Sequence, residues 1–350
     1  SSEEIIEFAT SFNESPDSDI LIAGGEGMAE DYSSDSFSST TTASFSADMA
    51  IGAVSELTGK EAVSAAYGFQ IDLNTSFTGE DSLDISIDGG NAIANGLGEF
   101  ALNGTADKLS VDGVAYTFPL GSKTTVFVGD NTDGSALYST ACVYGGPGDT
   151  LDDCGNANSA LGTGGGTAAG ASFDIGNGFT AAIGYTGDGG TNGLLTSEGL
   201  DAYGAQATYT ADSYGVSLTY ATIEGASSSD VVYYAANAYW TPAETGSLPS
   251  ISVGYEKGDP EATTGDTSHY FVGLQWDEVG PGTFGAALGT TGHTVSDATS
   301  YIMYEAFYSY PINDGMTVTP LVYVKEASGN DQTGILVKTC LLYTSDAADE

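Results

Sequence analysis

The stretch AVSAAYGFQIDLNTSF, residues 62–77, alternates between an apolar face and a polar or small face. The apolar face carries Val63, Ala65, Tyr67, Phe69, Ile71 and Leu73. The other face carries Ser64, Ala66, Gly68, Gln70, Asp72 and Asn74. A period of two residues is the signature of a β-strand. The pattern runs for about 11 residues, the length of a tilted strand that crosses a bilayer, whereas strands of soluble proteins average ~5 to 6. The stretch therefore predicts a membrane-spanning strand.

The same alternation recurs along the chain. It is clear in residues 40–55, where Phe45, Met49 and Ile51 share one face and Asp48 lies on the other. Further strands are expected near 82–88, 109–118, 123–129, 168–176, 178–187, 200–210, 214–224, 231–241, 250–257, 267–278, 282–290, 300–310, 316–325 and from 333 onward. The total is about sixteen, an even number within the range of single-chain bacterial barrels. We therefore expect an all-β fold, a transmembrane antiparallel β-barrel of about 16 strands.

The connections between these strands alternate in length. Short turns are expected at 119–123, 176–178, 211–215, 279–283 and 312–316. Longer acidic, Gly-rich loops are expected at 187–199, 241–250 and 257–268. Short turns on one rim and long loops on the other are typical of outer-membrane barrels.

Aromatic residues occur in pairs near both ends of several predicted strands. The pairs are Tyr203 and Tyr209, Tyr214 and Tyr220, Tyr234 and Trp240, Tyr270 and Trp276, and Tyr304 and Tyr310. Two aromatic girdles are expected where a barrel meets the two membrane–water interfaces. The alternative is that Tyr recurs because it is a good strand former.

Composition agrees with a β-rich chain and excludes one class of partner. The 350 residues include 49 Gly and 21 Tyr but only 6 Lys and no Arg, and the formal net charge is −42. Nucleic acid is excluded as a partner, because phosphate binding needs clustered Lys and Arg. Cations and neutral solutes remain, although many of the acids are explained equally well as a solvated surface. No apolar run approaches the ~18 to 20 residues of a membrane-spanning helix.

Three stretches carry a resemblance to a known family. They are QIDLNTSFTGEDSLDISIDGGNA (70–92), DGVAYTFPLGSKTTVFVGDN (112–131) and YEAFYSYPINDGMTVTPLVYVKE (304–326). The chain resembles, over roughly residues 39–339, the cyanobacterial outer-membrane iron-uptake porins, which are related to the carbohydrate-selective porins. These strand and turn motifs imply a scaffold, an outer-membrane location and a lipid environment. The family name implies inorganic iron uptake, and barrels of this width imply a homotrimer.

The resemblance also divides the chain. Residues 1–38 are acidic and Ser-rich and are expected to form a weakly ordered leader or linker, followed by a porin β-barrel at 39–339. Members of the family usually carry a peptidoglycan-binding S-layer homology domain and a coiled coil before the barrel, and residues 1–38 show neither. Residues 340–350, CLLYTSDAADE, resemble a translated sequencing adaptor, so the last strand is expected to end after Thr339. The alternative is a genuine short polar tail.

If the apolar faces meet lipid, the opposite faces line the interior. By alternation this face carries Gln70, Asp72, Asn74, Asp84, Ser86, Asp88, Asp174, His269, Gln275, Asp277, Glu305, Tyr323, Lys325 and Lys338. Carboxylates in a low-dielectric wall concentrate cations and repel anions. We therefore expect passive diffusion of small hydrophilic solutes and cations through an acidic, weakly cation-selective pore.

The longest segment without a strand pattern, residues 130–168, is the best candidate for a loop that folds into the barrel. Cys142 and Cys154 lie within it, and a disulfide between them is expected in an oxidising compartment. The segment also contains five candidate oxygen ligands for Ca²⁺, the residues Asp130, Asp133, Asp149, Asp152 and Asp153. Their spacing does not match the twelve-residue calcium loop, so solvated loop acids are the alternative. No other cofactor is expected.

No enzyme motif is present. The two histidines, His269 and His293, have no nucleophile motif or metal-binding spacing around them. A soluble or surface-attached acidic, Gly-rich β adhesin is the main alternative to a porin. Such a protein would not need apolar faces ~10 residues long.

Overall fold

The computed structural model describes residues 40–55, 62–92, 97–155, 161, 166–190, 193–196, 199–225, 230–244, 247–261, 265–296 and 298–345. The leader expected at residues 1–38 lies outside these ranges. In the part of the chain that the structure describes, no helix is long and apolar enough to cross a membrane.

The described chain forms seventeen strands, of which sixteen have nine residues or more and one, β14, has two. The strands are β1 (Thr41–Val54), β2 (Ser64–Thr75), β3 (Ser82–Gly90), β4 (Ser110–Pro119), β5 (Thr124–Thr132), β6 (Gly166–Gly176), β7 (Phe179–Gly187), β8 (Asp201–Thr210), β9 (Tyr214–Ile223), β10 (Val231–Trp240), β11 (Ser250–Pro260), β12 (Thr267–Val279), β13 (Gly282–Thr290), β14 (Thr294–Val295), β15 (Ile302–Asn313), β16 (Met316–Lys325) and β17 (Gln332–Ser345). Two short 3-10 turns, η1 (Gly98–Phe100) and η2 (Asp149–Gly155), accompany them.

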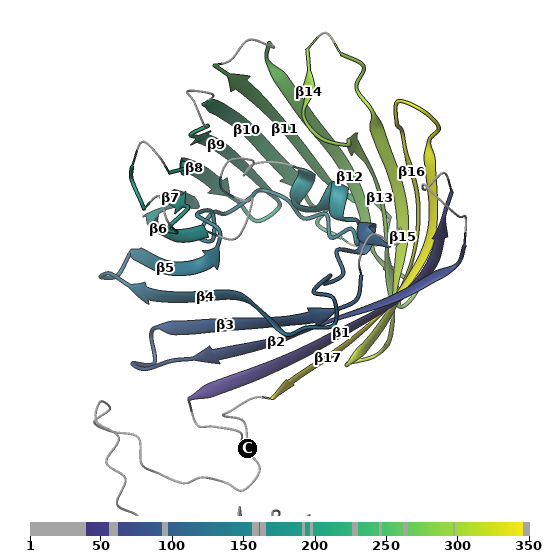
Figure 1. Ribbon diagram of the computed structural model, residues 1–350, viewed down its shortest axis with the longest axis horizontal. Coiled ribbons are helices and arrows are strands. Elements are labelled where there is room, and N and C mark those ends of the chain that lie inside the picture. The colour runs from purple at the N-terminus through teal and green to yellow at the C-terminus, as the bar shows by residue number, and fades with distance from the viewer. Residues whose placement is uncertain are drawn as a thin grey trace, which may run out of the picture. The chain divides into compact units, whose positions relative to one another are not determined.

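The sheet closes on itself as an antiparallel barrel (Figure 1). Each long strand pairs with its neighbours in the sequence, and β1 pairs with both β2 and β17. Ala47, for example, lies opposite Phe69 on one side and Leu341 on the other. Closure leaves no unpaired sheet edge, which is the requirement for a β-structure in lipid. The all-β antiparallel barrel of sixteen long strands that the sequence predicts is confirmed.

Alternation sorts the side chains as the pattern of residues 62–77 predicts. On β9 the outward residues Val216 and Leu218 are 41 and 60% exposed, whereas the inward residues Ser217 and Thr219 are buried. The outward surface is therefore apolar over the middle of the strands. On the inward surface, buried and polar residues predominate.

Aromatic side chains gather at both ends of this apolar surface. Near the short turns, the rings of Phe179, Tyr209 and Tyr214 lie in succession, with centroids 4.6 and 5.9 Å apart. Near the opposite rim Tyr220 and Tyr234 pack edge to face at 5.6 Å. The geometry is that of two girdles.

The five short turns lie on one rim, because each joins strands at the same end of the barrel. The loops at 187–199 and 257–268 lie on the other rim, as predicted. The loop at 241–250 was expected there too, and this was wrong. It joins β10 to β11 on the short-turn rim, since Trp240 lies opposite Tyr214 of the neighbouring strand. Acidic, Gly-rich composition does not record which rim a loop occupies.

The last strand does not end after Thr339. β17 continues to Ser345, and residues 340–345 pair along the first strand as far as Ala43. The β1 strand begins at Thr41 and so offers unpaired backbone groups beyond Thr339, which the continuing chain satisfies. Residues 346–350 lie outside the described residues.

Two segments fold inward from the rim that carries the longer loops (Figure 1). We call residues 97–109, between β3 and β4, the first inner segment, and residues 133–155, between β5 and β6, the second inner segment. A buried apolar cluster joins both segments to the inward faces of β1, β2, β12, β13 and β15–β17. It contains Leu97, Phe100, Leu151, Phe271, Phe307 and Leu336, among others. One side of the interior is therefore packed like a protein core.

Candidate functional site

The second inner segment crosses the inward face of the barrel wall. Side chains of the wall accept hydrogen bonds from its backbone N–H groups. Side-chain oxygens of five wall strands each accept one N–H. The pairs are Gly134 with Thr186 (2.7 Å), Ser139 with Gln206 (2.7 Å), Ala141 with Ser217 (3.3 Å), Val143 with Ser252 (3.0 Å) and Gly145 with Gln275 (2.9 Å). These residues come from β7, β8, β9, β11 and β12.

These hydrogen bonds between the segment and the wall have a physical reason. An extended segment inside a barrel has no partner strand, and a buried N–H without an acceptor costs ~1 to 3 kcal/mol. The donors at 139, 141, 143 and 145 alternate, as the backbone of an extended chain does. Sequence reasoning identified Gln275 as an interior residue but missed Thr186, Gln206, Ser217 and Ser252. The available signal was one polar side chain among small residues on the inward face of each strand.

A disulfide closes the second inner segment on itself. Cys142 and Cys154 are bonded, with their Cα atoms 6.0 Å apart and a sequence separation of 12. Cys154 is fully buried in the apolar cluster, which also contacts Cys142. A loop of this length is stabilised by about 3 kcal/mol in the chain-entropy model. The pair that the sequence suggests is thus joined in the structure.

Glu305 of β15 anchors the middle of the same segment. Its Oε1 accepts a hydrogen bond of 2.7 Å from the Tyr144 hydroxyl, and the side chain is only 4% exposed. Burial, followed by the nearby charge of Glu305, raises the pKa of the Tyr144 hydroxyl, so Tyr144 stays a donor. A Cβ at Gly146 or Gly148 would come within about 2.5 or 2.1 Å of the Glu305 carboxylate, so glycine makes room for it. Glu305, expected to line the pore, is covered by the segment.

The first inner segment lies against β1–β3. Asn103 Nδ2 donates to the Phe69 carbonyl at 3.0 Å, and a Cβ at Gly68 would lie 2.8 Å from Asn103 N. Leu97 and Phe100 are buried, and Glu99 is directed at β16. This segment has no strand pattern, and its inward fold was not predicted.

Two lysines on the inward faces of the strands, Lys325 of β16 and Lys338 of β17, are paired with acids. Lys325 Nζ lies 2.7 Å from Glu99 Oε1, and Lys338 Nζ lies 3.6 Å from Asp48 Oδ2 and 5.6 Å above the Phe100 ring. A nearby carboxylate therefore neutralises the charge of each of these two lysines.

The inward face of β2–β5 is acidic instead. Asp72 accepts from Gln70 and from Ser86, at 2.8 and 2.6 Å, and Asn74 donates to Asp84. Asp88, on the same face of β3, is buried beside Asp112. These predicted interior residues from two strands thus lie together, as alternation requires.

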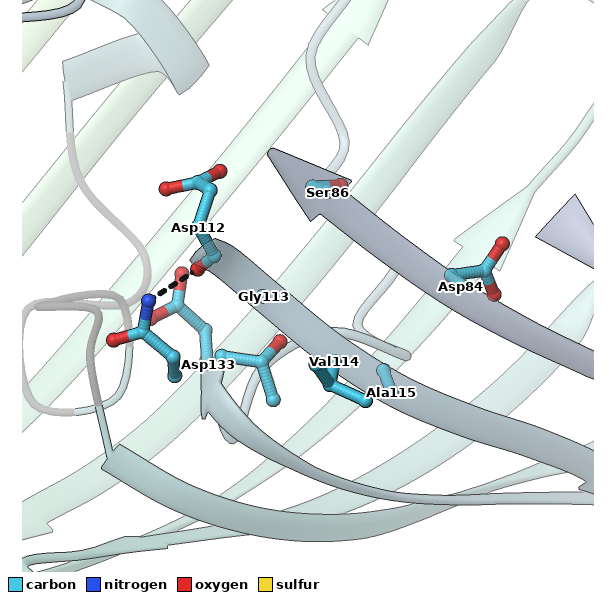
Figure 2. A pocket seen from close by; sticks show the side chains of 9 residues that line it. Asp84, Ser86, Asp112, Gly113, Val114, Ala115 and Asp133 are labelled. Carbon is cyan, nitrogen blue, oxygen red and sulfur yellow. Dashed lines mark hydrogen bonds between the residues drawn. The ribbon is translucent and has the colours of Figure 1, made fainter. Parts of the chain in front are cut away.

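A cavity of about 370 Å³ opens at this wall, lined by Asp84, Asp112 and Asp133 with Ser86 between them (Figure 2). Two β-bulges meet there, at Asp112 of β4 and at Asn131 of β5. Asn131 adopts a left-handed φ of 53° and donates to the carbonyls of Val111 and Asp112. Bulges re-aim side chains, and here the bulge shifts the register around Asp112. The described residues that line this cavity include no lysine. Sequence reasoning missed Asp112 because a bulge breaks the alternation.

The other predicted interior residues are spread along the wall. Gln275 Nε2 donates to Asp277 at 3.0 Å, and Asp174 accepts from Gly176 N at the turn after β6. His269 faces inward but is 6% exposed, with its ring 5.7 Å from that of His293. Tyr323 is buried in the apolar cluster. Alternation predicts the side of the sheet, but not which inward residues the inner segments cover.

The aspartates considered for Ca²⁺ whose side chains the structure describes form no common site. Asp130 accepts from Thr167, Asp133 lines the acidic cavity, and Asp149 lies near Glu99. The second inner segment separates them by crossing the barrel. Among the residues that the structure describes, no group of three or more His, Cys, Asp or Glu side chains is placed to hold a metal ion. The side chain of Asp153 lies outside the described set.

Several solved porin structures are similar to this barrel. It is similar to OprB of Pseudomonas putida, with a TM-score of 0.60, 13% identity, and coverage of 87% of this chain and 94% of that one. It is also similar to an anion-selective porin from Comamonas acidovorans (TM-score 0.62, 14% identity, 87% and 99% coverage). A mutant porin of Rh. blastica gives a TM-score of 0.58 at 14% identity, with 87% and 100% coverage. No family model and no curated protein matches the chain.

These identities show the fold and nothing finer. The chain has a porin-like fold, a closed antiparallel barrel of sixteen long strands.

Proposed function

We propose that this protein is an outer-membrane porin that passes small hydrophilic solutes and cations by passive diffusion. The observation that carries the proposal is the combination of an apolar outer surface between two aromatic girdles with a polar interior. A water-facing interior and a lipid-facing exterior are what a channel needs. A soluble adhesin would have to expose this apolar belt to water, where patches of such size promote aggregation.

Cation preference is supported by the charge of the interior. Lys325 and Lys338, on the inward faces of β16 and β17, are paired with acids, whereas Asp84, Asp112 and Asp133 line a cavity with no lysine among its described lining residues. Carboxylates in such a wall raise the local concentration of cations. We further propose that inorganic iron uptake is the physiological use, that the outer membrane belongs to a cyanobacterium, and that the barrel assembles as a homotrimer.

The test is reconstitution of the purified protein in planar lipid bilayers. Stepwise conductance and a reversal potential that favours K⁺ over Cl⁻ in a salt gradient are expected. Comparison of conductance in K⁺, in Fe²⁺ and with a neutral sugar then ranks the solutes. A protein that remains monomeric without detergent and forms no channels contradicts the proposal, as does anion preference.

A further inference from the structure

The two inner segments come from different loops, yet they meet at one point on the wall. Glu99 belongs to η1 of the first segment, Thr150 belongs to η2 of the second, and Lys325 is the last residue of β16. The three side chains are far apart in sequence, so only the fold brings them together.

The contacts among them form a closed triangle. Lys325 Nζ donates to Glu99 Oε1 at 2.7 Å and to Thr150 Oγ1 at 2.8 Å. Thr150 in turn donates through its hydroxyl to Glu99 Oε1 at 3.1 Å and through its backbone N–H to Oε2 at 3.3 Å. The Glu99 and Lys325 side chains are 11 and 29% exposed. Charge-assisted hydrogen bonds in such a partly buried place are among the stronger polar contacts.

The surroundings of Lys325 are strongly acidic. Asp149 lies beside the triangle; burial and the charge of Glu99 raise the pKa of its carboxyl, and the charge of Lys325 lowers it. Glu305 also lies within electrostatic reach of Glu99 and Asp152. Lys325 therefore interacts with two carboxylates, those of Glu99 and Asp149, and its charge is neutralised locally instead of acting on a passing solute.

We propose that Lys325 is a positioning residue of the pore, which ties the two inner segments together through Glu99 and Thr150 and thereby sets the width of the passage. The proposal rests on the proposed porin function only for its effect on conductance. The contacts among Lys325, Glu99 and Thr150 belong to the folded chain, so hydrogen exchange can measure their effect whether or not the protein forms a channel.

The experiment uses the full chain in detergent and in bilayers, with variants that separate position from charge. Lys325→Met and Glu99→Gln change the net charge in opposite directions, and the double variant restores it. Lys325→Arg keeps the ion pair, and Thr150→Val removes the hydroxyl contacts without any change in charge. The matched control is Lys257→Met with Asp266→Asn, an exposed pair with a 2.7 Å contact on the rim.

Hydrogen exchange of the peptide that contains Thr150 should be about tenfold faster in Lys325→Met, in Glu99→Gln, in their double variant and in Thr150→Val. The reason is that a hydrogen bond to a charged group contributes ~1.5 to 3 kcal/mol, and 1.4 kcal/mol corresponds to a factor of ten. In bilayers these four proteins should conduct more than the parent. The double variant should keep the parent's reversal potential, and Lys325→Arg and the rim control should behave as the parent.

Unchanged exchange in the Thr150 peptide overturns the proposal. A second pattern also overturns the proposal. In it, Lys325→Met and Glu99→Gln shift the reversal potential in opposite directions without changing conductance, and the double variant restores the parent's reversal potential. Lys325 would then act as a charge in the solute path. If the parent itself forms no channels, the proposed function fails, and the exchange measurement still decides whether the tie exists. Circular dichroism and heat-modifiable migration show that each variant is folded, and Thr150→Val leaves every wall residue intact.

Discussion

The acidic cavity at β3–β5 gives the sharpest prediction about selectivity. The change is the triple variant Asp84→Asn, Asp112→Asn and Asp133→Asn, which keeps side-chain size and removes three charges from one cavity. We expect the preference for cations over anions to fall, because the described lining contains no cation that already neutralises these charges.

The expected loss of cation enrichment follows from the size of the cavity. A volume of about 370 Å³ corresponds to a sphere of ~4.5 Å radius, so an ion at its centre lies ~7 Å from the lining oxygens once a contact of ~2.8 Å is added. Two unit charges at ~7 Å interact by ~0.6 kcal/mol in water, and screening in 0.1 M salt reduces this to ~0.3 kcal/mol. Each carboxylate then enriches cations ~1.6-fold, and three enrich them about fourfold.

The assay is the reversal potential in a KCl gradient, measured at two ionic strengths. The triple variant should lose roughly fourfold of cation enrichment near 0.1 M salt and about tenfold near 0.01 M, where screening is weaker. Asp212→Asn, in the short turn between β8 and β9, is the matched control and should change nothing. A triple variant with the parent's reversal potential at both salt concentrations would refute the cavity as a selectivity element.

Three further predictions concern the inner segment and one turn. The variant with both Cys142→Ser and Cys154→Ser should open the second inner segment more often, with hydrogen exchange faster by up to ~100-fold, since the disulfide contributes about 3 kcal/mol; exchange equal to that of the parent would contradict this. Gly148→Ala should displace the Glu305 carboxylate, cost ~1 to 3 kcal/mol in thermal unfolding and change conductance, whereas Gly292→Ala, which has open space around it, should do neither. The Asp81 carboxylate accepts from Tyr116, Ser76 and Thr78, and these bonds hold its pKa well below the ordinary 3.8. Its contribution to stability is therefore present above pH 3.8 and lost as pH falls through the depressed pKa, and a normal titration of Asp81 by NMR would sink this prediction.

The strands were predictable because a strand between lipid and water has to alternate. Phe69, Ile71 and Leu73 face outward and Gln70, Asp72 and Asn74 face inward, as the period of two requires. The paired cysteines were predictable because their spacing and an oxidising compartment limit the choices.

The interior was only partly predictable, because alternation does not tell whether an inward side chain is exposed to the passage or covered by an inner segment. Glu305 and Lys325 were expected to line the pore, and the structure shows them holding the inner segments instead. Asp112 escaped prediction because a bulge shifts the register around it. The first inner segment has neither a period nor a disulfide, so nothing local distinguishes it from a surface loop.

The placement of the few lysines explains how the charge of the interior is organised. Lys325 and Lys338 lie on adjacent strands, β16 and β17, where both contact the first inner segment and are paired with acids. The apolar cluster fills the same side of the barrel, and the acidic cavity lies at β3–β5. A solute is therefore expected to follow the wall of β3–β5, where the charged residues among the described lining of the cavity are all negative. Charge reversal on that wall, as in Asp84→Lys, should block cations far more than the same change at Asp48, whose partner Lys338 belongs to the packed side.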